Sequence, residues 1–172
     1  YEASLFNGKG VRFIVDVMPQ KMHNFKLIII PDTTYVKKET LDEMKKYIEN
    51  GGRVMIMGEK CLAKDEHGLE HDKSLVEYIT NNSTVIKYEG SDIKMINMTG
   101  EEFCNIVREE LKSAGAYYIS VVNAETGKPA YMVEYNLGVH DGKVIVNLAN
   151  FGEDIKVNIY AGDKKMLSGV EL

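Results

Sequence analysis

The chain has 172 residues, no tryptophan, three prolines and two cysteines. The absence of Trp argues against a sugar-stacking platform, although ten tyrosines remain. Cys61 and Cys104 are too few for a disulfide framework and do not identify a redox compartment. No apolar run approaches the ~20 residues that a membrane helix needs. We therefore expect no membrane partner.

Positive charge is also scarce, with 21 Lys and Arg against 26 Asp and Glu and a net charge of -5. Because no basic surplus attracts a phosphate backbone, we expect no nucleic-acid partner. The content of 44% hydrophobic and 27% charged residues is typical of a globular protein. The chain starts in mid-element without Met or a signal pattern. We expect the N-terminus of the full protein to be missing, which leaves the localisation unknown.

A strand–helix–strand unit near the N-terminus organises the rest of the chain. Two apolar runs of strand length, Lys26–Ile30 and Arg53–Met57, flank a helix expected over Leu41–Ile48. Thr40 precedes this helix and Glu43 follows three residues later, which is the spacing of a capping box. Such a unit predicts a parallel sheet covered by helices.

The other elements divide into two groups at about residue 116. The first group comprises a helical turn at Tyr1–Phe6, a strand at Val11–Met18, a helix at Ser74–Asn81, a strand at Thr84–Tyr88, and a helix from a Thr99/Glu102 capping box to Gly115. The second group has short strands at Tyr118–Val122, Tyr131–Tyr135, Lys143–Leu148 and Ile155–Tyr160, then two more that end at Leu172. Asp141-Gly142 is a hairpin signal. We predict an α/β domain at 1–116 and a small antiparallel β-sandwich-like domain at 117–172.

Cys61 follows the second strand of the unit and could lie at the carboxyl edge of a parallel sheet, where open α/β sheets bind ligands. A nucleophilic cysteine needs a sharp strand-to-helix elbow and a nearby base. The small residues in Gly58–Ala63 are misplaced for such an elbow. We therefore expect a half-buried thiol in a loop, without a catalytic role.

His67 and His71 stand four residues apart among four acidic residues: Asp65, Glu66, Glu70 and Asp72. On a helix, histidines at i and i+4 can share a metal. Gly68 and the polar surroundings favour a loop instead, and a third spaced ligand is missing. We expect a solvated acidic loop and no metal site.

Three further patterns fit structural roles better than catalytic ones. Asn7–Gly10 combines glycines with a lysine, but it precedes a strand instead of opening a helix, so it does not predict a phosphate cradle. The carboxylate pairs Asp42/Glu43 and Glu101/Glu102 lie at helix starts, where they favour the helix dipole. Four tyrosines could stack on a sugar, although strand tyrosines more often pack: Tyr117, Tyr118, Tyr131 and Tyr135. We predict no catalytic, cofactor-binding or metal residues in this chain.

Several of these segments resemble a known family. Phe25–Pro31, Leu41–Ile48 and Glu49–Val54 together resemble the middle domain of family 42 β-galactosidases and related bacterial glycoside hydrolases. Further segments resemble motifs of that domain or of the small C-terminal β domain that follows it: Gly10–Val17, Leu62–Gly68, Gly142–Asn150 and Met166–Gly169.

The resemblance implies a glutamine-amidotransferase-like, flavodoxin-like fold with a three-layer parallel sheet. In β-galactosidases this domain serves as a trimerisation domain. The given sequence lacks the family's catalytic barrel, so the two catalytic glutamates have no counterpart here. The Cys-His-Glu set of amidotransferases has no match either.

The resemblance therefore implies a non-catalytic accessory region of a glycoside hydrolase that acts in carbohydrate metabolism. We expect it to form homo-oligomers, to flank the sugar cleft of a catalytic barrel domain, and to use no cofactor. The loop Asp32–Lys38 and the helix Leu41–Ile48 are the expected contact surface. The alternatives are a carbohydrate-binding module and, less favoured, an amidotransferase-like enzyme.

Overall fold

A computed structural model describes residues 1–58, 60–86, 98–116 and 119–172. The chain forms two compact units. Unit 1 combines Tyr1–Arg12 with Met98–Leu172, and unit 2 is Phe13–Asn97. This division places residues 98–116 in the same unit as the C-terminal β strands. It is a division by contacts, and the domain boundary at residue 116 stays a prediction. Within the described ranges, no helix is long and apolar enough to span a membrane.

Unit 2 contains the parallel sheet that the strand–helix–strand unit predicts. Its strands are β1 (Leu27–Ile30), β2 (Arg53–Met57) and β3 (Thr84–Ile86), in the order β1-β2-β3. Ile28 pairs with Val54, and Met55 pairs with Thr84, both in parallel register. The predicted strand at Thr84–Tyr88 is thus confirmed as far as Ile86, and its last two residues lie outside the described ranges.

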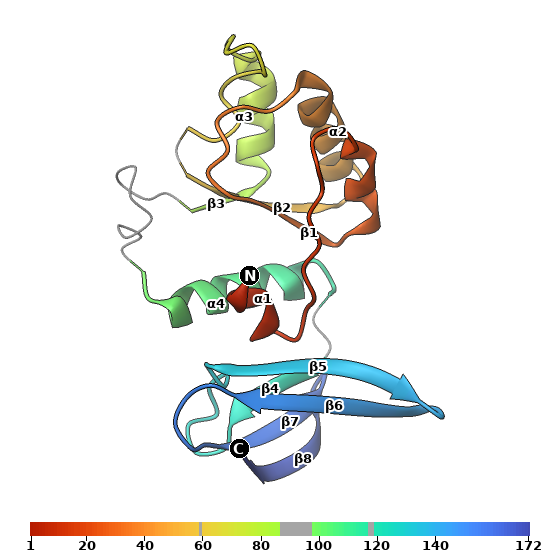
Figure 1. Cartoon of the computed structure of the whole chain (residues 1–172), viewed down its shortest axis with the longest axis vertical. Coiled ribbons are helices and arrows are strands. Elements are labelled where there is room, and N and C mark those ends of the chain that lie inside the picture. Colours follow the sequence, from red (N-terminus) through yellow and green to blue (C-terminus); the bar gives the residue numbers. More distant parts are fainter. Residues whose placement is uncertain (59, 87–97, 117–118) are drawn as a thin grey trace. The chain divides into compact units, whose positions relative to one another are not determined.

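Two helices, α2 (Lys38–Glu49) and α3 (Lys73–Asn81), lie on the same side of this sheet (Figure 1). Leu41 and Met44 of α2 and Ile79 of α3 are buried in one core with Val54 and Ile56 of β2. The apolar faces that the periodicity of both helices predicts are therefore buried within unit 2. The finer expectation of a three-layer, flavodoxin-like arrangement stays a prediction.

The predicted capping box at Thr40 and Glu43 is wrong. Helix α2 begins at Lys38, after Lys37, so Thr40 already lies in the first turn. Its hydroxyl donates to the backbone carbonyl of Asp16 (3.3 Å) and to the Asp16 carboxylate. The same carboxylate accepts the Lys37 backbone N–H at 3.2 Å. Asp16, which lies 21 positions before Lys37, therefore takes the role of the helix cap.

The predicted strand at Val11–Met18 is also wrong. Residues 11–15 have no regular structure, Asp16 and Val17 form a turn, and a 3₁₀ helix, η1 (Pro19–Asn24), follows. Strand formation needs a hydrogen-bonded neighbour as well as apolar alternation. Within the described part of the chain, this stretch pairs with no strand.

Unit 1 starts with a short helix, α1 (Glu2–Leu5), and continues after residue 98 with α4 (Gly100–Ser113). The second predicted capping box is confirmed. The Thr99 hydroxyl accepts the Glu102 N–H at 3.2 Å, and the Glu102 carboxylate accepts the Thr99 N–H at 2.6 Å. The Asn7 amide fastens α1 to α4, because it donates to the carbonyls of Ala3 (2.7 Å) and Cys104 (3.0 Å).

The rest of unit 1 is antiparallel, as predicted. Strands β4 (Ile119–Asn123), β7 (Lys156–Ala161) and β8 (Lys164–Glu171) form one sheet, while β5 (Val133–His140) and β6 (Lys143–Asn150) form a hairpin. Strand β8 replaces the two short strands expected near the C-terminus. Asp141 (φ 48°) and Gly142 (φ 71°) make the predicted tight turn. Sheet and hairpin share a core of Ile119, Val121, Ala130, Val133, Tyr135, Val157 and Ile159.

Candidate self-association surface

Cys61 is buried in unit 2, and its Sγ lies 3.9 Å from the carbonyl oxygen of Pro31. Burial is the main cause that raises the pKa of the thiol. A backbone hydrogen bond at Thr33 lowers it, the negative charge of Asp32 raises it, and a backbone hydrogen bond at Leu62 lowers it, with a net rise. A thiol held in its protonated form is a weak nucleophile. The surroundings of Cys61 therefore do not activate it.

The two histidines of the acidic loop serve different structural purposes. The Nε2 atom of His71 lies 2.7 Å from the carbonyl oxygen of Val36, a hydrogen-bond distance. The backbone N–H of His67 donates to the Asp65 carboxylate at 2.9 Å, and so does that of Leu69 at 2.8 Å. Desolvation raises the pKa of Asp65, but these two N–H groups and the charges of His67 and His71 together give a net shift downward. The loop is thus held by its own backbone.

The remaining acidic residues of this loop do not gather around a common point. Asp72 caps α3 by accepting the Ser74 N–H at 2.8 Å, Glu66 is exposed, and Glu70 forms a backbone bridge with Lys64. Across the described ranges, no three His, Cys, Asp or Glu side chains come close enough to hold a metal ion.

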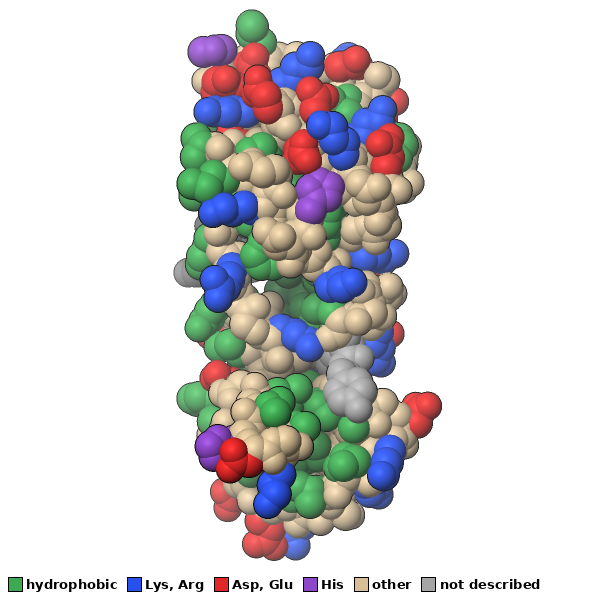
Figure 2. All heavy atoms as spheres, turned by 90° about the vertical axis from the view of Figure 1, so that its right-hand side faces the viewer, with side chains coloured by type: hydrophobic (Ala, Val, Ile, Leu, Met, Phe, Trp, Pro, Cys, Tyr) green, Lys and Arg blue, Asp and Glu red, His purple; other side chains and the backbone are tan. Residues whose placement is uncertain are grey.

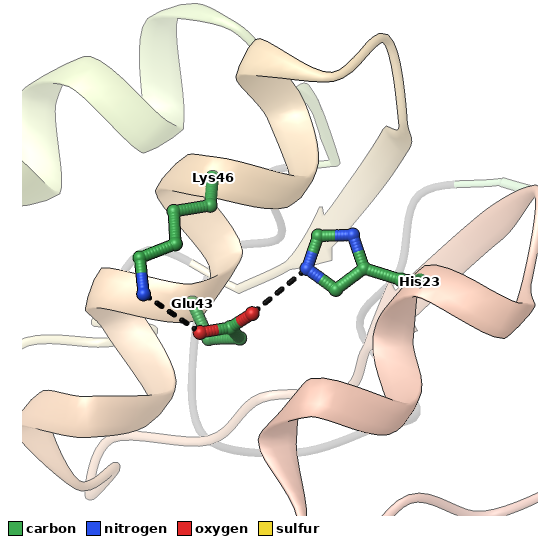
Figure 3. Close-up of polar contacts among 3 residues, drawn as sticks. All are labelled: His23, Glu43 and Lys46. Atoms are coloured by element: carbon green, nitrogen blue, oxygen red, sulfur yellow. Dashed lines mark hydrogen bonds and ion pairs between the residues drawn. The ribbon is translucent and has the colours of Figure 1, made fainter.

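In each predicted carboxylate pair, one carboxylate is bound by partners of its own. The Glu43 carboxylate lies 3.1 Å from the ammonium of Lys46 and 2.8 Å from Nε2 of His23 (Figure 3). The hydrogen bond from Lys46, followed by that from His23, lowers the pKa of Glu43. The backbone N–H of Thr99 lowers the pKa of Glu102 within the capping box. Glu43 therefore links α2 to η1, and Glu102 stabilises the start of α4.

The glycine-rich stretch Asn7–Gly10 leaves no room for a phosphate group at Gly8. A Cβ at Gly8 would overlap the ring of Tyr135, so the glycine permits close packing of backbone on ring. Asn7 is fully buried, and burial lowers the pKa of Lys9. The stretch ends α1 and packs it against the strands of unit 1.

The described tyrosines of the candidate sugar platform are also packed within unit 1. Tyr135 is buried and its hydroxyl donates to the carbonyl of Ile119 at 3.0 Å. The ring of Tyr131 packs edge to face on Phe6, with centroids 5.7 Å apart. Tyr117 and Tyr118 lie outside the described residues. Both described rings therefore have packing partners within unit 1.

The apolar face of hairpin β5–β6 continues past the core that it covers. Val133 and Tyr135 of β5 are buried in that core, and residues two positions apart share one face of a strand. Leu137 and Val139 lie on the same face, yet Val139 is 76% exposed. Val144, which pairs with Val139, is 61% exposed. We call Leu137, Val139 and Val144 the hairpin overhang.

The pictures show why the overhang is uncovered. The hairpin extends beyond the sheet β4-β7-β8 with its turn farthest out (Figure 1). Viewed toward that side, hydrophobic side chains gather on the part of the molecule built by β4–β8 (Figure 2). The other face of the hairpin is mixed: Asn136 and Asn147 bond there through their side chains at 2.9 Å, and Ile145 is also exposed on it. The continuous apolar stripe is therefore confined to the face that carries the overhang.

Unit 2 exposes a second apolar surface, the 13–18 segment (Phe13–Met18). Ile14 packs on the core of unit 2 and Asp16 binds the start of α2. The side chains of Phe13, Val15 and Val17 are exposed, and Phe13 is 88% exposed. The apolar run that predicted a strand is thus largely exposed to solvent.

The contact surface expected at Asp32–Lys38 and Leu41–Ile48 stays a prediction. The apolar face of α2 is in the core, and Tyr35 is the large apolar side chain that this loop exposes. The hairpin overhang was missed by sequence reasoning, although the alternation in β5 and β6 was visible. The missing information is how far the core extends under the hairpin, which depends on β4 and β7.

Comparison with known proteins identifies the class. Residues 4–160 match the family described as the beta-galactosidase trimerisation domain. The chain belongs to this family, and the resemblance found in its motifs is confirmed.

A solved structure with the same fold is the crystal structure of apo exo-carrageenase GH42 from Bacteroides ovatus. The TM-score is 0.62 at 21% identity, over 100% of this chain and 24% of that chain. The chain thus spans about a quarter of that protein. No curated protein matches the chain significantly.

Proposed function

We propose that this chain is a non-catalytic region of a larger glycoside hydrolase, where it joins copies of the protein and flanks the sugar cleft of a barrel domain. Its family is described as a trimerisation domain, which implies a homo-oligomer. The larger protein is supported by the match to one quarter of a glycoside hydrolase chain. Its substrate follows from the barrel and not from this chain.

The observation that carries the proposal is the hairpin overhang. Burying a valine that was fully exposed contributes about 1.5–3 kcal/mol. Association costs several kcal/mol in lost freedom, and a stable interface buries roughly 800 Å² per partner. The overhang is therefore the apolar centre of a contact, with His140, Asp141 and Lys143 at its polar rim.

A closed ring of three copies needs two different patches on each copy, because its contacts are head-to-tail. The chain exposes two apolar surfaces, the hairpin overhang in unit 1 and the 13–18 segment in unit 2. We propose that the overhang of one copy packs on the 13–18 segment of the next. Both surfaces expose large apolar side chains, which this contact would bury.

The experiment measures the mass of the chain in solution as a function of concentration, by light scattering and sedimentation. The wild type should form trimers. Val139→Asp removes apolar burial and places a carboxylate in the contact, so it should weaken association by more than about thirtyfold. Phe13→Asp should have a similar effect if the second patch is correctly placed.

Ile145→Asp is the matched control, because Ile145 is exposed on the opposite face of the same hairpin. It should leave the trimer intact. Circular dichroism verifies that each variant is folded. A wild type that stays monomeric at high concentration, or a Val139→Asp variant that still forms trimers, would overturn the proposed contact.

The non-catalytic part of the proposal has its own test. In a Cys104→Ala background, a thiol reagent at pH 7 should label Cys61 slowly in the native chain and rapidly after unfolding. Burial and a raised pKa both slow the reaction. Rapid native labelling with a depressed apparent pKa would instead favour an amidotransferase-like enzyme.

A further inference from the structure

Unit 1 contains a cavity of about 600 Å³ between α4 and the outer face of the sheet β4-β7. Arg108 and Lys112 line it from α4, one helical turn apart. Ser120 and Tyr160 line it from the sheet, where they are paired residues on β4 and β7. Gly127 and Gly162, which lie in the loops after β4 and β7, also line it. Its volume lies within the range of small-molecule sites.

Cations outnumber acids in this cavity, although the chain as a whole has a net charge of -5. Arg108 is only 4% exposed, so its guanidinium is largely removed from water. A third cation stands nearby, because the ammonium of Lys165 lies 5.6 Å from the ring centroid of Tyr160. The lining has one carboxylate, that of Asp163, in the turn between β7 and β8.

From this arrangement we propose that the cavity binds an oxyanion, namely a sulfate or carboxylate group, either free or carried by an anionic sugar. A guanidinium presents a planar fork of N–H donors that matches two oxygens of such a group. Lys112 adds a mobile point charge, and the Ser120 hydroxyl adds a neutral donor. The inference goes beyond self-association and does not depend on it.

Protein groups already use part of this hydrogen-bonding capacity. Arg108 donates to the side-chain oxygen of Asn105, and Lys112 lies 2.8 Å from the Glu109 carboxylate. A guanidinium has five N–H donors and an ammonium has three, so each can make several contacts at once. Glu109 is a surface residue, and an oxyanion competes with it for Lys112 at modest cost.

The experiment is calorimetric titration of the whole chain at low ionic strength, where electrostatic binding is least screened. The four probes are sodium sulfate, galactose 6-sulfate, galacturonic acid and neutral galactose. The first three should bind saturably and galactose should not. Equal affinity for sulfate and galactose 6-sulfate indicates recognition of the oxyanion alone, whereas tighter binding of the sugar sulfate indicates contacts to the ring.

Variants assign the binding to the cavity. Lys112→Gln should weaken it about threefold, and Asp163→Asn should strengthen it about twofold, because each changes one charge at a partly exposed position. Arg108→Lys keeps the charge, loses the fork, and should weaken binding about tenfold. Lys21→Gln makes the same charge change as Lys112→Gln at an exposed site in unit 2 and should have no effect.

The exposed position of Lys112 protects this test from misfolding, which is a risk at the buried Arg108. The absence of saturable binding by all three anions would overturn the inference. Binding that is equal in the wild type, Lys112→Gln and Asp163→Asn would overturn it too, as would equally tight binding of neutral galactose.

Discussion

The hairpin β5–β6 and the 13–18 segment both expose apolar side chains, yet only the hairpin is a pair of strands. In the hairpin, the Asp141-Gly142 turn returns the chain onto itself and supplies the hydrogen-bonding neighbour. The 13–18 segment finds no such neighbour among the described residues. It is tethered instead by one carboxylate, that of Asp16. A run of apolar residues therefore does not form a strand by itself. A hydrogen-bonded neighbour decides whether a strand forms.

The anchorage of the hairpin gives the largest expected effect. Val133 and Val139 share a strand and a face, but Val133 is fully buried whereas Val139 is mostly exposed. Val133→Ala should lower the free energy of unfolding by about 2 kcal/mol, from lost burial and the cavity left behind. Val139→Ala should change it by less than about 0.5 kcal/mol. Urea titration of dilute protein measures both values, and equal losses would show that the core extends to the tip.

The anchorage of the 13–18 segment should be weaker. Asp16→Ala removes the acceptor for the Lys37 N–H and the Thr40 hydroxyl, so it should cost about 1 kcal/mol, as the loss of a helix cap does. Thr99→Ala, which removes the local cap of α4, should cost about the same.

Glu77→Ala on the exposed face of α3 is the matched control and should stay within about 0.5 kcal/mol of the wild type. Limited proteolysis provides a second readout. Asp16→Ala should speed cleavage within residues 13–18, and Thr99→Ala should not. Unchanged stability in Asp16→Ala would mean that the tether has no energetic role.

The smallest expected effect concerns His23, which ties η1, directly after the 13–18 segment, to α2 through Glu43 (Figure 3). The pKa of Glu43 is lowered from its ordinary value of 4.5, so its contacts stabilise the fold above that pH. The contribution is lost as the pH falls through the lowered value. Glu43→Gln should therefore cost about 0.5 kcal/mol at pH 7 and nothing near pH 2.

Glu49→Gln is the control on the same helix, because Glu49 has only a 3.8 Å contact with Lys45 on the surface. It should leave stability unchanged at neutral pH. Thermal unfolding at a series of pH values measures both variants. An effect of Glu43→Gln that persists at pH 2 would show that packing, and not charge, is responsible.

Several elements whose signals lie within a few residues agree with the prediction. The capping box of Thr99 and Glu102, the Asp141-Gly142 hairpin and the parallel pairing of Lys26–Ile30 with Arg53–Met57 are confirmed. Each depends on local hydrogen bonds or on the length and apolarity of one run. The family, too, was predicted from such runs and is confirmed.

The errors occurred where the partner is distant in the sequence. Thr40 was assigned to a capping box with Glu43, but Asp16 binds Thr40 and His23 binds Glu43. Nothing within α2 indicates either partner. The hairpin overhang could not be predicted for the same reason. Strands β4 and β7, which pack on the hairpin, determine which of its apolar side chains are buried.

The sequence by itself determined most of the elements, the faces of the paired strands and of the helices, and the membership in the trimerisation-domain family. These follow from residue spacing and from backbone preferences, which act over one or two turns. Only the tertiary structure decided which apolar faces stay uncovered and which polar groups find partners. Burial and pairing are properties of surfaces that meet, and the chain must fold before those surfaces exist.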